Sequence, residues 1–382
     1  MTHATISGAD EAGLRAVFQA ADTWGAVASV YLGRTPGALR DPDLELRWHA
    51  MTGSLAGHGV DEPTLDALHR RVMAGPAGSD GIAMFAAAGD VLFARETPGS
   101  GHADRAVGGR LPHVLPLLAW MQRRPPHVVV TVDRRGAELV SVRRGQASGE
   151  TVTVYGPDDE IERNRPGGWS QPRYQHRAED SWLHNAATVA DAVARALRRV
   201  RARLLVLAGD VRARQLLEEH LGAAFRRHVV IRHVTGGRAP DGSQAIHAAE
   251  VAEAVTGIAE DETAGLLDRL AEGRGPDGRT VEGVRPTLDA LAQGRVSTLF
   301  VVDDPGDERV AWFGPGTCRL AERPDAPSVV GARPTGARLT DAAVGAALLT
   351  RAGVRVLAPG SAHAPAEAIG ALCRFRVPPA GS

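Results

Sequence analysis

The chain has 382 residues, more than one ordinary domain needs, and 43% of them are apolar, which suffices for packed cores and argues against general disorder. The formal net charge is -1, and all 44 basic residues are arginine because the sequence contains no lysine. A phosphate-binding loop of the nucleotide-hydrolase type, which requires a lysine, is therefore excluded. Two cysteines, Cys318 and Cys373, are too few for a disulfide framework or a four-thiolate zinc site.

Other signals of common protein classes are absent from the sequence. No glycine-rich dinucleotide loop, serine-nucleophile elbow or zinc-protease helix is present, and the histidines lack metal spacing. No basic segment followed by an apolar core opens the chain, and no apolar run approaches the ~20 residues that span a bilayer. We therefore expect a cytoplasmic protein with no cofactor, no metal and no membrane contact.

The N-terminal domain is predicted to cover residues 1–124. It contains an apolar strand at 26–32, an amphipathic helix at 62–73, and two strands at 81–88 and 90–94 that are joined by a Gly-Asp turn. Residues 97–110 are rich in glycine, which predicts a loop. The prolines at 125 and 126 end the preceding helix and mark a boundary.

The middle domain is predicted to cover residues 125–273. A hairpin at 127–132 and 138–143 and a third strand at 151–155 precede a long helix at about 178–200, whose residues Val189, Val193, Leu197 and Val200 form one apolar stripe. A buried strand at 203–208 and helices at 211–220 and about 245–272 follow. This alternation of strands and helices predicts a layered, largely parallel α/β domain.

The C-terminal domain is predicted to cover residues 274–382. Helices at 287–293 and 339–352 alternate with strands at 297–303, 310–313, 354–358 and 369–377, which predicts an α/β/α sandwich. The fold class is therefore α/β, with three domains in series: an N-terminal α+β domain, a layered middle domain with a protruding loop, and the sandwich.

One segment before the long middle helix differs in composition from the rest of the chain. From Arg163 to Arg177 there are four arginines, two aromatic residues and no acidic residue, and Pro166 with the paired glycines predicts a loop. Guanidinium groups neutralise phosphates and aromatic rings stack on bases, so this composition is typical of a nucleic-acid contact. The alternative for the segment is a solvated connection without function. The alternative for its individual residues is a loop that packs against its own domain and buries Trp169. The candidate residues are Arg163, Arg165, Gly167, Gly168, Trp169, Ser170, Gln171, Arg173, Tyr174, Gln175 and Arg177.

The same segment resembles a known motif. The run Gly167-Gly168-Trp169-Ser170-Gln171 is similar to the Gly-Gly-Gln loop that archaeo-eukaryotic release factors carry between a strand and the long helix of the middle domain. The run from Arg173 to Asp180 resembles the Arg-Tyr/Phe-Gln-x-Arg-Ala-Glu-Asp sequence of bacterial relatives. Residues 287–294, 297–302 and 368–375 resemble elements of the same family. The chain thus resembles the release factor/Pelota superfamily, and in particular its bacterial branch related to the hibernation factor Balon.

The resemblance implies a release-factor/Pelota-like fold and a ribosome-binding translation factor of the hibernation or rescue type, active in stress. Such a factor occupies the A site and directs its loop toward the peptidyl-transferase centre. The implied partners are the 70S ribosome and its rRNA, with elongation factor Tu and tRNA as further candidates. Trp169 and Tyr174 are expected to stack on bases, and Arg165, Arg173 and Arg177 to contact phosphates.

Departures from the family pattern bear on activity. Trp169 and Ser170 separate Gly168 from Gln171 and displace the glutamine by up to ~7 Å, so the hydrolytic geometry does not carry over. The stop-codon motifs Asn-Ile-Lys-Ser and Tyr-x-Cys-x-x-x-Phe are absent, which argues against codon-specific termination. We expect a non-catalytic binder. The alternative is a peptidyl-tRNA ester hydrolase or tRNA-cleaving enzyme in which Gln171 orients water, and a third reading is an interaction protein that kept only the fold.

Overall fold

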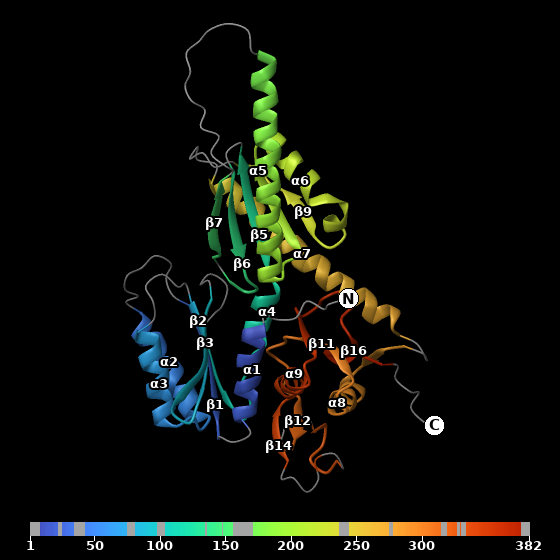
Figure 1. The fold of residues 1–382 in the computed structure, drawn as a ribbon. Coiled ribbons are helices and arrows are strands. Elements are labelled where there is room, and N and C mark those ends of the chain that lie inside the picture. The colour runs from blue at the N-terminus through green and yellow to red at the C-terminus, as the bar shows by residue number, and fades with distance from the viewer. Residues whose placement is uncertain are drawn as a thin grey trace. The chain divides into compact units, whose positions relative to one another are not determined.

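The structure, a computed structural model, describes residues 8–21, 25–33, 43–74, 81–97, 104–133, 136–146, 148–155, 171–236, 244–274, 278–314, 319–326, 329 and 334–375. The chain divides into two compact units (Figure 1). The middle unit is Arg123–Asp261, and the split unit combines Met1–Gln122 with Glu262–Ser382. The chain enters the middle unit just before the paired prolines and leaves it inside a helix rather than after Gly273. The division into three domains stays a prediction.

The N-terminal part of the split unit is an antiparallel sheet with helices on both faces. Helices α2 and α3 pack on one face, and α1 and α4 share the core on the other. The predicted strand at 26–32 and helix at 62–73 are confirmed. The strand order is β3-β2-β1-β4, with β1 Val27–Gly33, β2 Gly81–Ala87, β3 Asp90–Thr97, β4 Arg105–Gly109, α1 Gly8–Ala21, α2 Leu44–Gly57, α3 Glu62–Met73 and α4 Leu115–Gln122.

The predicted loop at 97–110 is wrong in its second half, because β4 pairs there with β1 in the register Val27↔Gly109. Glycine weakens a strand but leaves its backbone free to pair when a partner strand is available. No side chain fits at Gly108, because a Cβ atom there would lie 2.6 Å from the Cβ atom of His58. The glycines therefore let the end of α2 lie against β4.

The C-terminal part of the split unit has three layers. Along β11, Leu299 and Val301 belong to the core under α8 and α9, whereas Phe300 and Val302 pack with the end of α7 (Gln244–Glu272). This alternation is the inside-outside period of a strand buried on both faces, and it forms the predicted α/β/α sandwich. One sheet has the order β10-β16-β11-β15 and a small second sheet β13-β12-β14, with β10 Thr280–Glu282, β11 Val296–Val302, β12 Val310–Phe313, β13 Leu320–Ala321, β14 Thr335–Arg338, β15 Gly353–Leu357, β16 Ile369–Cys373, α8 Val284–Ala292 and α9 Leu339–Leu349.

Residues from both ends of the chain share one apolar core in the split unit. Helix α1 packs on α9, where a Cβ atom on Gly345 would lie 2.7 Å from the ring of Phe18. At the edge strand β15, the side-chain amide of Gln122 donates to the carbonyl of Val356 and its oxygen accepts from the Val356 amide at 2.9 Å. Gln122 thus pairs like a short strand with an otherwise open edge.

A buried polar chain joins the same two parts of the split unit. Nε2 of His113 lies 3.1 Å from Nη1 of Arg105, which can only donate, so Nε2 accepts and Nδ1 carries the hydrogen. Nδ1 donates to Oδ1 of Asp341 at 2.8 Å, with both side chains almost excluded from solvent. The backbone of His113 is held as well, because its carbonyl accepts from the Tyr31 hydroxyl at 2.6 Å and its amide donates to Oγ of Ser29 at 2.9 Å.

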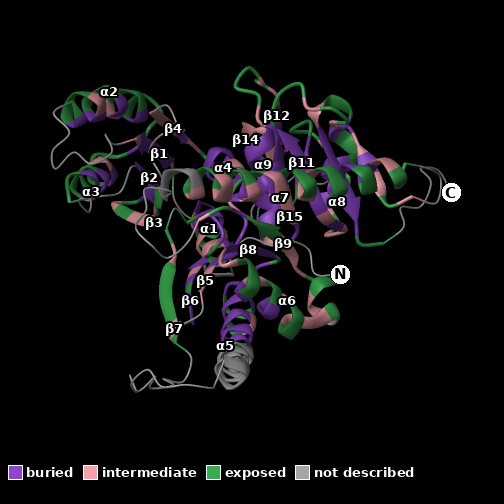
Figure 2. Ribbon diagram, turned by 90° about the horizontal axis from the view of Figure 1, so that it is seen from above, coloured by how far each residue is buried: buried purple, intermediate pink, exposed green. Residues whose placement is uncertain are grey.

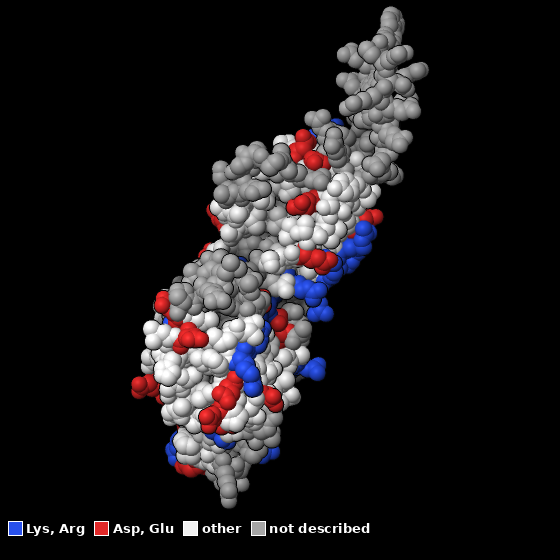
Figure 3. Space-filling model, turned by 90° about the vertical axis from the view of Figure 1, so that its left-hand side faces the viewer, with Lys and Arg blue, Asp and Glu red and all other residues white. Residues whose placement is uncertain are grey.

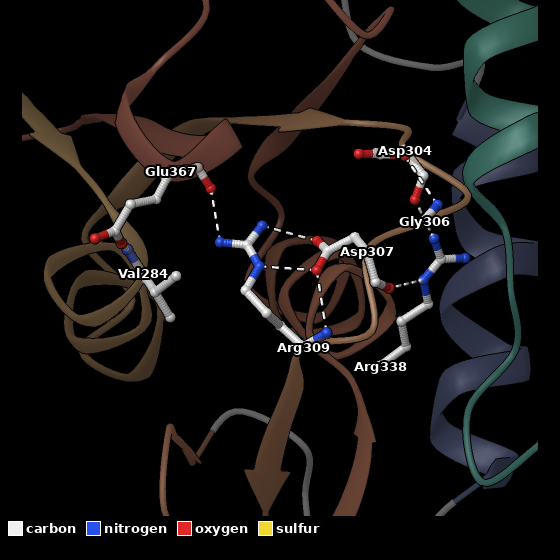
Figure 4. A network of polar contacts seen from close by, with 7 residues as sticks. All are labelled: Val284, Asp304, Gly306, Asp307, Arg309, Arg338 and Glu367. Carbon is white, nitrogen blue, oxygen red and sulfur yellow. Dashed lines mark hydrogen bonds and ion pairs between the residues drawn. The ribbon is translucent and has the colours of Figure 1, made fainter.

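A second polar network fixes the loops at the edge of the C-terminal sheets (Figure 4). The guanidinium of Arg309 donates twice to Asp307, at 2.8 Å each, and once to the carbonyl of Glu367 at 2.8 Å. Hydrogen bonds from Arg309 lower the pKa of Asp307 below its ordinary value. The carboxylate of Glu367 accepts from the amide of Val284, which satisfies the N-terminus of α8. Arg338 donates to the carbonyl of Asp307 at 3.3 Å.

The middle unit is a five-stranded sheet between helical layers, in which α5 and α6 cover one face and the first half of α7 covers the other. Strands β5, β8 and β9 are parallel, whereas β6 and β7 return as antiparallel hairpins. Figure 2 shows the buried face of α5 along its described part. The order is β7-β6-β5-β8-β9, with β5 His127–Asp133, β6 Gly136–Val142, β7 Glu150–Tyr155, β8 Leu204–Gly209, β9 Val230–His233, α5 Gln171–Val200, α6 Val211–Arg226 and α7 Gln244–Glu272.

Candidate nucleic-acid interface

Helix α5 begins earlier than the sequence predicts. It starts at Gln171 rather than at about residue 178, so Gln171, Arg173, Tyr174, Gln175 and Arg177 belong to its first turns. Proline is tolerated in the first helical turn, so Pro172 is compatible with this start. The candidates Arg163, Arg165, Gly167, Gly168, Trp169 and Ser170 lie outside the described residues, as do the side chains of the five candidates on α5.

The other end of α5 is firmly anchored. The predicted apolar stripe is confirmed, because Val189, Val193, Leu197 and Val200 are all at most 8% exposed. They pack in one cluster with residues of β5 and β6 such as Val130. The segment that carries the candidate loop therefore continues directly into a helix that is fixed to the sheet, which is how a rigid scaffold positions a functional loop.

The connection from β8 to α6 is equally constrained. Gly209 has φ +107°, and a Cβ atom there would lie 1.9 Å from the carbonyl oxygen of Val132, so only glycine fits. Asp210 follows as the N-cap, and its carboxylate accepts from the amides of Arg212 and Ala213 at 2.9 and 3.1 Å. This turn fixes the start of α6 against the carboxyl ends of the parallel strands.

A cleft of about 860 Å³ opens at that edge of the sheet, between α6 and α7. Nε of Arg214 is buried there without a hydrogen-bond partner among the described residues. Glu250 on the facing helix accepts from the amide and the hydroxyl of Thr235, and these hydrogen bonds lower its pKa. Open α/β sheets usually bind ligands at the carboxyl ends of their strands. The lining residues are Gly209, Arg214, Arg232, His233, Val234, Thr235, Gly236, Glu250, Glu253, Ala254 and Gly257.

The sequence-based prediction did not include this cleft. Its residues come from four segments, the ends of β8 and β9, the first turn of α6 and the first half of α7, and no segment alone has an unusual composition. Among the residues that the structure describes, no group of three or more His, Cys, Asp or Glu side chains could hold a metal ion. None of the described helices is long and apolar enough to cross a membrane.

The comparisons with known proteins agree with this architecture. A family model, "Bacterial archaeo-eukaryotic release factor family 2", matches residues 126–276, which include the five-stranded sheet and helices α5 to α7. Two Mycobacterium tuberculosis proteins, Rv2629 of strain H37Rv and MT2704 of strain CDC 1551, are each 25% identical over 362 residues, covering 92% of this chain and 94% of theirs.

Solved structures of translation factors are also similar to the chain. The archaeal termination factor aRF1 has 15% identity and a TM-score of 0.25, covering 96% of this chain and 98% of its own. Dom34 of S. cerevisiae has 10% identity and a TM-score of 0.42, covering 81% and 76%, and Pelota of Archaeoglobus fulgidus has 14% and 0.34, covering 93% and 96%.

The layered middle unit, with its five-stranded sheet and the long helix α5, is the part of the chain that the release-factor family model matches. The matched family model is specific for this part of the chain: residues 126–276 are similar to the bacterial branch of the archaeo-eukaryotic release factor superfamily. A closer relationship to Balon stays a prediction.

Proposed function

We propose that the protein is a cytoplasmic, ribosome-binding translation factor of the hibernation or rescue type. It occupies the A site, directs the loop from Arg163 to Arg177 toward the peptidyl-transferase centre, and contacts rRNA there. The observation that carries the proposal is the family match over residues 126–276, because it includes both the loop and the helix that supports it.

The start of α5 at Gln171 adds a physical argument. The first amides of a helix lack acceptors within the helix, and the helix dipole makes this end positive. Helix N-termini therefore favour phosphate groups, and in this chain the N-terminus directly follows a loop with no acidic residue between Arg163 and Arg177. Both features attract RNA to the same end of the middle unit.

Co-sedimentation with vacant 70S ribosomes through a sucrose cushion tests the proposal. The wild type and a control variant, Arg70→Ala/Arg285→Ala, should pellet with 70S, because both control residues are exposed arginines of the split unit. Trp169→Ala/Arg173→Ala should remain in the supernatant as salt is raised, since it loses stacking and a phosphate contact. If the wild type does not pellet at any salt, with or without elongation factor Tu, the proposed function is refuted.

The alternative function, hydrolysis of peptidyl-tRNA or cleavage of tRNA, depends on Gln171. Gln171→Ala would abolish turnover in an enzyme that uses the glutamine to orient water, but it would scarcely weaken a binder that uses stacking and charge. Release of a labelled peptide from stalled ribosomes, measured beside co-sedimentation of the same variant, therefore separates the two functions. We expect no release by the wild type and unchanged pelleting of Gln171→Ala.

A further inference from the structure

The end of the middle unit at the C-terminus of α5 carries a dense arginine cluster. It is formed by the C-terminal ends of α5 and α6 and by the connections that lead from them into β8 and β9. Every member is exposed. Figure 3 shows arginine side chains gathered along the lower part of α5. The members are Arg195, Arg198, Arg199, Arg201, Arg203, Arg226 and Arg227.

The parallel pairing of β8 with β9 brings the two halves of the cluster together. Leu204 is in register with Val230, and the amide of Val230 donates to the carbonyl of Arg203 at 2.7 Å. The connections at 201–203 and 227–229 therefore lie side by side at one edge of the sheet. Helices α5 and α6 pack on the same face of the sheet, so their last turns end at this edge too.

Little negative charge balances the cluster. Residues 192–209 and 220–240 contain no aspartate or glutamate. Arg199 forms an ion pair with Glu150 at 2.9 Å, and within the described part of the chain the side chains of Arg198, Arg201 and Arg227 have no ion-pair partner. A helix C-terminus favours one or two cations through its dipole. That local effect does not explain Arg201 and Arg227, which follow the helices.

We infer that this cluster binds the phosphate backbone of double-helical RNA. Guanidinium groups bind phosphate oxygens in pairs and keep their charge at every physiological pH. Residues 198–203 and 226–229 include no Phe, Tyr or Trp, so they offer arginine charge rather than large aromatic rings for stacking unpaired bases. RNA helices are recognised mainly through shape and backbone contacts, which an array of arginines can supply.

The inference goes beyond the proposed function because it concerns a different surface. Helix α5 has 30 residues, and at 1.5 Å per residue the cluster lies ~45 Å from the start of the helix. The middle unit would thus contact RNA at two well-separated points, the loop at one end and the arginine cluster at the other. Neither contact requires the other.

The test is binding of the full-length protein to a fluorescent RNA duplex, followed by anisotropy between ~50 and ~200 mM salt. Arg198→Gln/Arg201→Gln/Arg227→Gln should lower the slope of log affinity against log salt by ~2 to 3, and affinity at the lowest salt by at least tenfold. A control with the same charge change, Arg70→Gln/Arg285→Gln/Arg319→Gln, should bind like the wild type. Thermal unfolding followed by circular dichroism confirms that all three proteins are folded.

An unchanged slope in the cluster variant overturns the inference. Binding of polyglutamate is measured in the same way. If the cluster variant loses binding to polyglutamate but keeps its binding to the duplex, the inference is also overturned, because the surface would then recognise acidic peptides. The loop variant Trp169→Ala/Arg173→Ala separates this inference from the proposed function, because it should lose pelleting with 70S, whereas adding the three cluster substitutions to it should lower the salt slope as much as in the wild type. Wild-type protein that binds the duplex through the cluster but fails to pellet with 70S would refute the proposed function alone.

Discussion

Replacement of Asp341 by alanine tests whether the two ends of the chain form one cooperative unit. The carboxylate of Asp341 accepts from Nδ1 of His113 at 2.8 Å, and the two side chains are 7% and 0% exposed. A hydrogen bond to a charged group contributes about 1.5–3 kcal/mol, and an unsatisfied buried donor costs about 1–3 kcal/mol. We expect Asp341→Ala to destabilise the split unit by about 3 kcal/mol, roughly a hundredfold in its folding equilibrium.

Hydrogen exchange measured by peptide mass spectrometry is the appropriate assay, because it reports on each segment separately. Amides of β1, near the N-terminus, and of β11, in the C-terminal part, should lose protection together, whereas those of β8 in the middle unit should not change. Asp341→Asn keeps an oxygen that can accept from His113 and should be less harmful than alanine. If β11 loses protection and β1 does not, residues 1–122 fold independently and the reasoning from the shared core is refuted.

Three further predictions concern the scaffold. Leu197→Ala should destabilise the middle unit by about 2–4 kcal/mol in urea denaturation, because the side chain is 3% exposed, whereas the exposed Arg195→Ala should have little effect. Gly209→Ala should lower the melting temperature of the middle unit markedly, since the new Cβ atom would lie 1.9 Å from a carbonyl oxygen; an unchanged melting temperature would contradict the described turn. The pKa of Asp307 is lowered by hydrogen bonds from Arg309, so its stabilisation is present above the ordinary aspartate pKa and lost as pH falls through the lowered value. Asp307→Asn should therefore be less stable than the wild type at neutral pH, with the difference shrinking below ~pH 4 in melting curves recorded across pH.

Local sequence patterns were sufficient to predict many of the helices and strands of the middle unit. The stripe of Val189, Val193, Leu197 and Val200 predicts α5 because helical spacing and burial both depend on residues three and four apart. The strand at 203–208 was predicted from a continuous apolar run, and the strand at 127–132 as one arm of a hairpin with 138–143. The composition of the segment from Arg163 to Arg177 also marked it as a candidate RNA contact, although the start of α5 at Gln171 was not predicted.

Elements that depend on distant partners were harder to predict. Strand β4 is short and rich in glycine, and it exists because β1 offers an edge for pairing, which no local pattern records. Strands β9, β10, β13 and β14 are shorter still, and each pairs with a strand elsewhere in the chain.

The sequence by itself determined the α/β class and the long helix of the middle unit, and it singled out the arginine-rich segment in front of that helix, because these features follow from the order of neighbouring residues. Only the tertiary structure decided that residues from both ends of the chain share one core, held by His113 and Asp341. It also decided that Arg201 and Arg227 lie at the same edge of the middle sheet, since the register of β8 with β9 places them there. The shared core and the meeting of Arg201 with Arg227 both result from pairing and packing between segments that are far apart in the sequence. Neither feature can be read from the neighbouring residues along the chain.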